Sequence, residues 1–188
     1  MTRRALSAAL RGAVRNLALV RVDRSCDPHP LLGYAVGLGE WLLLHVVNPD
    51  SMILNGYSAV RLRDVRKVAL MADEHEGFMV TALRASRVRP KPQARVSLKT
   101  TRWLLETSAR YFPLIAIHEE RKDIEVCWIG RPTGFPGTSV ELREVSPAGR
   151  WCTRPSRYQM RSITKIDFGG AYEGALAQIA GDVPADLH

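Results

Sequence analysis

Short runs with strand-like patterning, each ended by a turn, most constrain the fold of this chain. The clearest run lies near the C-terminus, where residues 158–168 have the pattern of a strand, two glycines follow, and residues 171–179 have helical spacing. An earlier stretch repeats this plan, with strand-like residues 57–62 and 65–68 and, after a polar gap, apolar residues 78–83. We therefore interpret the chain as one small module used twice.

Other strands are predicted on both sides of these stretches. They cover residues 32–38, 41–47, 57–62 and 65–71 in the first half, and residues 114–118, 124–130 and 139–145 in the second half. Asn55–Gly56 has the composition of a turn, and residues 131–137, with two prolines and two glycines, have that of a loop. So many short strands favour small, strongly bent barrels over a broad open sheet.

Helical patterns flank the strands. Apolar residues recur at helical spacing from Leu6 to Leu17, and arginines cluster on a different face. A second helix follows a cap at Ser97. A C-terminal helix is expected to bury four residues, Tyr172, Ala175, Leu176 and Ile179.

These patterns divide the chain into four parts. They are an N-terminal amphipathic helix (1–25), a first small β-barrel module (26–83), a basic connector with a helix (84–111), and a second module with the C-terminal helix (112–188).

This order of helix, short strands and closing helix resembles tandem small β-barrels of the Sm-like type. Residues 112–120, 163–170 and 172–173 also resemble a group of uncharacterised bacterial proteins. The resemblance covers roughly residues 30–180 and implies an α+β, mostly β fold of two tandem Sm-like small β-barrels with flanking helices. It implies no activity.

The chain also departs from true Sm proteins. Ring-forming, uridine-binding Sm proteins carry an aspartate and asparagine pattern in their loops, followed by arginine or lysine and glycine. Asn55–Gly56 is the nearest local match, and no second loop completes the pattern, so a uridine-specific ring is not expected.

The excess positive charge lies in the N-terminal segment and in the connector. The chain has a net charge of +8, with six arginines and one aspartate in residues 1–25 and seven basic and no acidic residues in residues 84–102. These seven are the candidate nucleic-acid-binding residues: Arg84, Arg87, Arg89, Lys91, Arg95, Lys99 and Arg102. The alternative interpretation is that they solvate a linker or bind the slightly acidic modules.

One group of side chains has the residue types of a cation-binding or acid–base site. His118, Glu119, Glu120, Asp123 and Glu125 crowd one end of a predicted hairpin, where a hard cation or a raised carboxyl pKa is conceivable. The alternative is a solvated turn that keeps a sheet edge soluble.

The cysteines give no metal or disulfide pattern. Cys26, Cys127 and Cys152 lack CxxC spacing, which favours a reducing, cytoplasmic setting, and Cys127 and Cys152 are expected to pack as small hydrophobes. The longest apolar run, residues 41–47, is far shorter than the roughly 20 residues of a membrane-spanning helix, so no membrane association is predicted.

The pattern as a whole favours an interaction module that is not an enzyme, because no nucleophile, base and orienting group occur together. Such a module would dock a protein partner or self-associate through its barrels, with no cofactor. The alternative is sequence-tolerant nucleic-acid (RNA) binding through the basic N-terminal helix and the connector.

Overall fold

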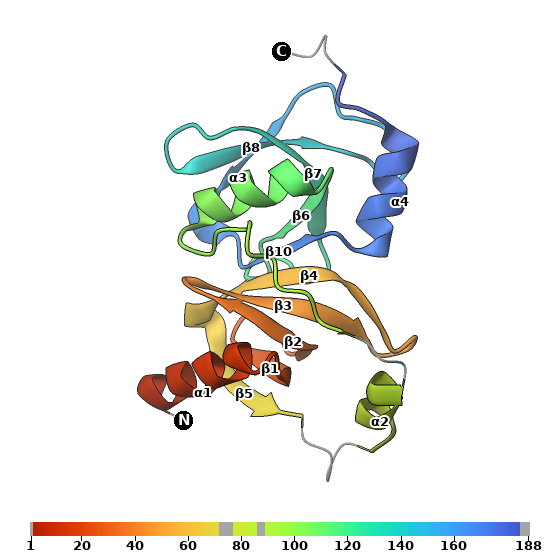
Figure 1. Ribbon diagram of the computed structural model, residues 1–188. Coiled ribbons are helices and arrows are strands. Elements are labelled where there is room, and N and C mark those ends of the chain that lie inside the picture. The colour runs from red at the N-terminus through yellow and green to blue at the C-terminus, as the bar shows by residue number, and fades with distance from the viewer. Residues whose placement is uncertain (1, 72–76, 86–88, 185–188) are drawn as a thin grey trace. The chain divides into compact units, whose positions relative to one another are not determined.

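A computed structural model describes residues 2–71, 77–85 and 89–184 (Figure 1). The chain divides into two compact units, Met1–Ala94 and Arg95–His188, which we call unit 1 and unit 2 and describe separately.

Unit 1 is a five-stranded antiparallel sheet with two helices. Its elements are α1 (Arg3–Arg15), β1 (Leu19–Arg24), β2 (Leu31–Leu38), β3 (Trp41–Asn48), β4 (Ile53–Arg61), the 3₁₀ helix η1 (Leu62–Asp64), β5 (Val65–Leu70) and α2 (Gly77–Ala85). The strand order is β5-β1-β2-β3-β4. The first four strands therefore pair in succession along the chain, and β5 returns to pair with β1.

The N-terminal helix packs as its apolar stripe predicts. The Thr2 hydroxyl accepts a hydrogen bond from the Ala5 amide at 3.3 Å and caps the helix. One face of α1 contacts β2 and β5. The core between them contains Leu6, Leu10, Ala13, Val20, Val22, Ala35, Leu42, Leu44, Val60 and Val65. The arginines of α1 are consequently left at the surface.

Two strands of unit 1 differ from the prediction. The helix ends at Arg15, and β1 follows at Leu19 within the segment that we assigned to helix. Val20 and Val22 are buried on one face of β1, an alternation too short to stand out beside a helical pattern.

Asn55–Gly56 is the second difference, because it lies inside β4 and forms no turn. Gly56 has φ +70°, and the register of β3 and β4 shifts between His45 and Val47. The glycine therefore serves a β-bulge.

Unit 2 contains α3 (Thr101–Tyr111), β6 (Ile115–His118), β7 (Cys127–Gly134), β8 (Ser139–Glu144), β9 (Ser156–Gln159), the 3₁₀ helix η2 (Met160–Ser162), β10 (Lys165–Phe168) and α4 (Ala171–Ala180). Its strands run antiparallel in the order β10-β6-β7-β8-β9. When the strands of each unit are numbered along the chain, the fifth strand lies beside the first in both units, and the second, third and fourth follow in order. In both units a 3₁₀ helix separates the fourth strand from the fifth, and a helix follows.

Several boundaries in unit 2 differ from the prediction. Thr100, and not Ser97, caps α3, since its hydroxyl accepts from the Trp103 amide at 3.2 Å. β7 begins later than predicted and continues through Pro132 into the segment that we assigned to a loop, with a register shift beside this proline. The strand predicted over residues 158–168 is interrupted by η2.

The closing helix presents a different face from the predicted one. Tyr172 and Ile179 are 56% and 70% exposed, whereas Leu176 is buried. Leu176 packs with Leu114 and Val145, while Ala177 and Ala180 line the same cluster. Small residues thus bring α4 close to the sheet.

The prediction of a mostly β fold with flanking helices is confirmed. Among the described residues, the first and last strands in the order of each unit are not paired with each other, so neither sheet closes within its unit. No helix in the described part of the chain is long and apolar enough to cross a membrane.

Candidate functional site

Three neighbouring elements of unit 1 carry a dense set of exposed cations. We call this set the basic surface, and it comprises Arg3, Arg4, Arg11 and Arg15 of α1, Arg63 of η1, and Arg66 of β5. The sole acidic residue in α1, η1 and β5 is Asp64, whose side chain is buried. The exposed charged side chains of α1, η1 and β5 are therefore all positive.

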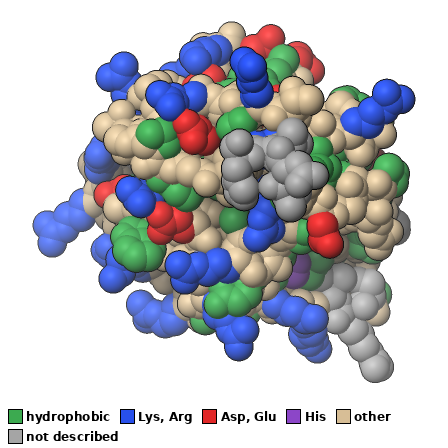
Figure 2. Space-filling view, turned by 90° about the horizontal axis from the view of Figure 1, so that it is seen from above, with side chains coloured by type: hydrophobic (Ala, Val, Ile, Leu, Met, Phe, Trp, Pro, Cys, Tyr) green, Lys and Arg blue, Asp and Glu red, His purple; other side chains and the backbone are tan. Residues whose placement is uncertain are grey.

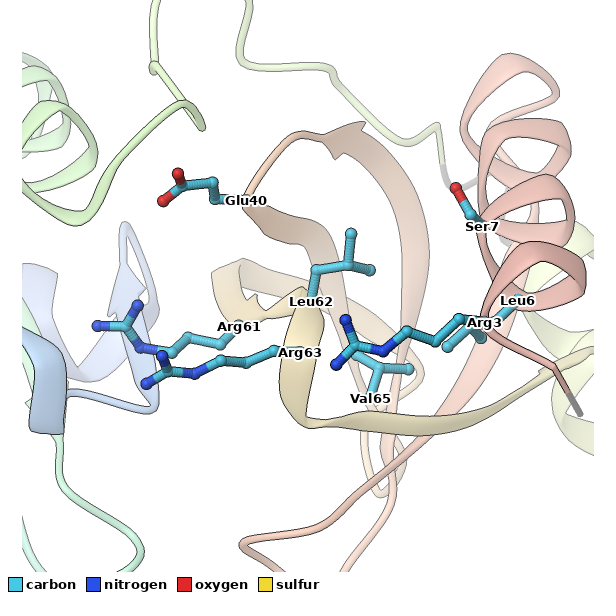
Figure 3. Close-up of a pocket in the computed structure, with 8 residues that line it drawn as sticks. All are labelled: Arg3, Leu6, Ser7, Glu40, Arg61, Leu62, Arg63 and Val65. Carbon is cyan, nitrogen blue, oxygen red and sulfur yellow. The ribbon is translucent and has the colours of Figure 1, made fainter.

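A cavity of about 510 Å³ lies within the basic surface (Figure 3). Arg3, Leu6 and Ser7 line it from α1, Glu40 from the β2–β3 turn, and Arg61, Leu62, Arg63 and Val65 from the β4–β5 connection. Figure 3 shows the Arg61 and Arg63 side chains extending in the same direction. An apolar floor bordered by guanidinium groups and one carboxylate suits an anionic ligand with an apolar part.

The guanidinium groups of this cavity have different environments. Arg61 is almost fully buried and lies 4.6 Å from the centre of the Trp41 ring, in a cation–π contact. The side chain of Arg63 is 52% exposed, and its Nε lies 3.9 Å from Asp64 Oδ1. Arg61 is therefore held in place by packing, whereas about half of the Arg63 side chain is exposed.

The predicted connector residues that the structure describes are divided between the two units. Arg84 lies in α2, and Arg89 and Lys91 are exposed in an extended segment of unit 1. Arg87 lies outside the described residues. Arg95, Lys99 and Arg102 are exposed residues of unit 2. On the face shown in Figure 2, Lys and Arg side chains are scattered and interspersed with Asp and Glu.

Three residues of this connector contact neighbouring residues of their own unit. The Lys91 amide donates to His45 Nδ1 at 3.1 Å, and the Lys91 carbonyl accepts from the Tyr57 hydroxyl at 3.0 Å. Arg95 lies over the ring of Tyr111, while Arg102 pairs with Glu106 at 2.8 Å and lies over Phe135. The Lys91 contacts are made by its backbone, whereas the Arg95 and Arg102 side chains contact residues of their own unit.

The predicted His118–Glu125 cluster is more ordered than a solvated turn. The hairpin pairing is confirmed, with His118 opposite Cys127. Glu119 and Glu120 are only 3% and 4% exposed, so the solvated interpretation is wrong for them. Glu119 pairs with Lys122 at 2.7 Å, and Glu120 lies 3.9 Å from Lys165. Asp123 and Glu125 are exposed.

A polar network instead spans β6 and β10. His118 Nε2 lies 2.8 Å from Asp167 Oδ2, and Lys165 Nζ lies 3.4 Å from the same oxygen. Burial, followed by the charge of Asp167, raises the pKa of Glu173 at the start of α4. In the described part of the chain, no group of three or more His, Cys, Asp or Glu residues is placed to hold a metal ion.

The cysteines of unit 2 differ from the prediction. Cys127 and Cys152 are exposed, and neither belongs to the core. Partial burial, followed by the charge of Asp167, raises the pKa of Cys127. The thiol therefore stays protonated at neutral pH, which opposes a role as a nucleophile beside His118.

Comparisons with protein-family models, with curated proteins and with solved structures found no match to this chain.

Proposed function

We propose that this protein is a non-enzymatic binding module that holds the phosphate backbone of a nucleic acid on the basic surface of unit 1. The observation that carries the proposal is the exposure of six cations on α1, η1 and β5, where the one acidic side chain is buried. Cations spaced along a helix and an adjacent strand can neutralise several phosphates without reading the base sequence.

The site proposed here differs from the connector site in the sequence analysis. α1 remains part of it, but η1 and β5 take the place of the connector. Arg95 and Arg102 support this change, because each lies against an aromatic ring of unit 2.

The proposed fold behind this function is a pair of Sm-like small barrels. Both units have a helix, five short strands in the same order, and a 3₁₀ helix before the fifth strand. This repetition supports the resemblance, and the reducing cytoplasm stays the proposed compartment.

The test is a fluorescence-polarisation titration of labelled single-stranded RNA and DNA at about 50 and about 200 mM salt. Contact with about four phosphates predicts an affinity that falls by about a hundredfold between these salt concentrations, with little difference between base sequences. Absence of binding at the lower salt concentration would contradict the proposal.

Self-association or docking of a protein strand is the second candidate. Among the described strands, β5 pairs with β1 alone and β9 pairs with β8 alone, so each strand has backbone groups on its outer side for another strand. Arg66, Lys67 and Arg157 are exposed on these strands, and charges of one sign oppose pairing of β5 with β9. For this reason self-association ranks second.

Light scattering coupled to size-exclusion chromatography tests the second candidate. Self-association predicts a mass that rises with protein concentration and returns to that of one chain when proline replaces a residue of β9. A mass of one chain at all concentrations would exclude this candidate.

A further inference from the structure

Unit 2 contains a cavity that is unrelated to the basic surface. Its volume is about 420 Å³, in the range of small-molecule sites. The walls come from the β6–β7 connection, the start of β7, and β9. The side chains that matter here are Glu119, Lys122, Val126, Trp128, Arg157 and Tyr158.

Two aromatic rings form one wall of this cavity. The Trp128 and Tyr158 rings are 5.0 Å apart with an interplanar angle of 45°. The Tyr158 hydroxyl donates to Glu144 Oε1 at 2.6 Å, which fixes its ring. Burial and this hydrogen bond raise the pKa of Tyr158, and the nearby charge of Glu119 adds to the effect. The wall is therefore a fixed, uncharged platform on which a planar ring can stack.

A buried acceptor lies beside this platform. The Glu119 side chain is 4% exposed, and its Oε2 accepts from Lys122 Nζ at 2.7 Å. Its Oε1 is buried and has no hydrogen-bond partner among the described residues. Glu119 lines the cavity, so its carboxylate can accept a hydrogen bond from a ligand N–H, which would contribute favourably to binding.

Two cations complete the cavity at its rim. Lys122 pairs with Glu119, and Arg157 pairs with Glu141 at 2.7 Å. Both side chains are nevertheless mostly exposed, and an ammonium and a guanidinium each have several donors. They can therefore bind an anionic group of a ligand as well.

We propose that this cavity binds a nucleotide whose base carries an exocyclic amino group. The base stacks on one ring of the Trp128–Tyr158 wall, its amino group donates to the Glu119 carboxylate, and its phosphate contacts Lys122 and Arg157. The nucleotide is a free mononucleotide or the base of a strand, and both sources present the same chemistry. The inference does not rest on the function proposed for unit 1, because every residue of this cavity belongs to unit 2.

Isothermal titration calorimetry of the full chain with adenosine, guanosine, cytidine and uridine monophosphates tests this inference. The first three bind, and uridine monophosphate binds about tenfold more weakly because its base has no exocyclic amino group. Glu119→Gln removes this preference, since an amide can also donate to a carbonyl. Glu125→Gln, an exposed change in the same connection, leaves it intact.

Further variants distinguish the loss of contacts with the ligand from a loss of folding. Val126 lies at the partly exposed wall of the cavity, so Val126→Trp fills the cavity without disturbing the core and abolishes binding. Trp128→Leu weakens binding of all the nucleotides, whereas Trp103→Leu, an exposed change on α3, does not. A short oligoadenylate that binds while adenosine monophosphate does not would assign the site to a base within a strand.

Three results would overturn the inference. They are the absence of binding of every mononucleotide and of the oligoadenylate, equal affinity for inorganic phosphate and the nucleotides, and equal affinity of the unaltered protein for the uridine and adenosine nucleotides.

Discussion

The Tyr57 hydroxyl donates a hydrogen bond to the Lys91 carbonyl at 3.0 Å, and the two residues are 34 positions apart in the chain. Gln93 Nε2 donates to the same hydroxyl at 2.8 Å, and His45 stacks on the Tyr57 ring with 4.4 Å between the ring centres. The segment after α2 is therefore bound to β3 and β4.

Tyr57→Phe should loosen this segment. The change removes two hydrogen bonds and leaves a part-buried carbonyl without its donor, so the free energy of unfolding should fall by about 1–3 kcal/mol. A protease of broad specificity should also cleave this segment faster, whereas trypsin does not cut the Arg89–Pro90 and Lys91–Pro92 bonds. Chemical denaturation and limited proteolysis measure the two effects. Tyr172→Phe, at an exposed tyrosine, is the matched control and should change neither.

His45 should make unit 1 sensitive to acid. Burial, followed by the charge of Lys91, lowers the pKa of His45. The unfolded chain then binds a proton more readily than the folded chain, so stability should fall as the pH drops below about 6.5. Unfolding measured between about pH 7 and about pH 5 should show a smaller loss in His45→Gln than in the unaltered protein. An equal loss in both would contradict this assignment.

Gly169→Ala and Gly174→Ala should change stability in opposite directions. Gly169 has φ +71°, and an added Cβ would lie 2.5 Å from the Phe112 ring, so the alanine should destabilise the fold by at least about 1 kcal/mol. Gly174 lies inside α4 with nothing near an added Cβ, so alanine should stabilise by about 0.5–1 kcal/mol. Thermal unfolding of both variants measures the difference, and a loss of stability in Gly174→Ala would show that α4 is not placed as described.

The Cys127 thiol should report on the polar network of unit 2. Besides burial, the negative charge of Asp167 raises its pKa, so Asp167→Asn should lower the pKa and speed alkylation at neutral pH. The measurement is the pH dependence of alkylation in a chain with Cys26 and Cys152 replaced by serine. Asp123→Asn, on the exposed β6–β7 connection, is the control, and equal acceleration by both changes would refute the role of Asp167.

Local patterns were enough to predict most of the elements. The α1 stripe from Leu6 to Ala13 and strand β3 were recognisable because helix and strand periods repeat there for several residues and a turn or helix end follows. Asn55–Gly56 was misassigned because a bulge and a turn use the same residues. The distinction depends on the partner strand β3, which a local pattern does not contain.

The sites depend on residues that are distant in sequence. Arg3 and Arg63 line one cavity only because α1 packs on the sheet, and Glu119 meets Tyr158 only through the pairing of β6 to β9. The sequence analysis placed the cations correctly along the chain. It could not show that η1 and β5 lie beside α1. For this reason it assigned nucleic-acid binding to the connector residues.

A comparison of two charge-matched variants tests the proposed function most directly. One variant changes Arg3, Arg4, Arg11 and Arg15 to glutamine, and the other changes Arg89, Lys91, Arg95 and Lys99 to glutamine. Each removes four exposed positive charges, so the net charge is the same in both. With single-stranded RNA at about 50 mM salt, the α1 variant should lose about a hundredfold in affinity and the connector variant about tenfold or less. A larger loss in the connector variant would contradict the assignment of binding to the basic surface of unit 1.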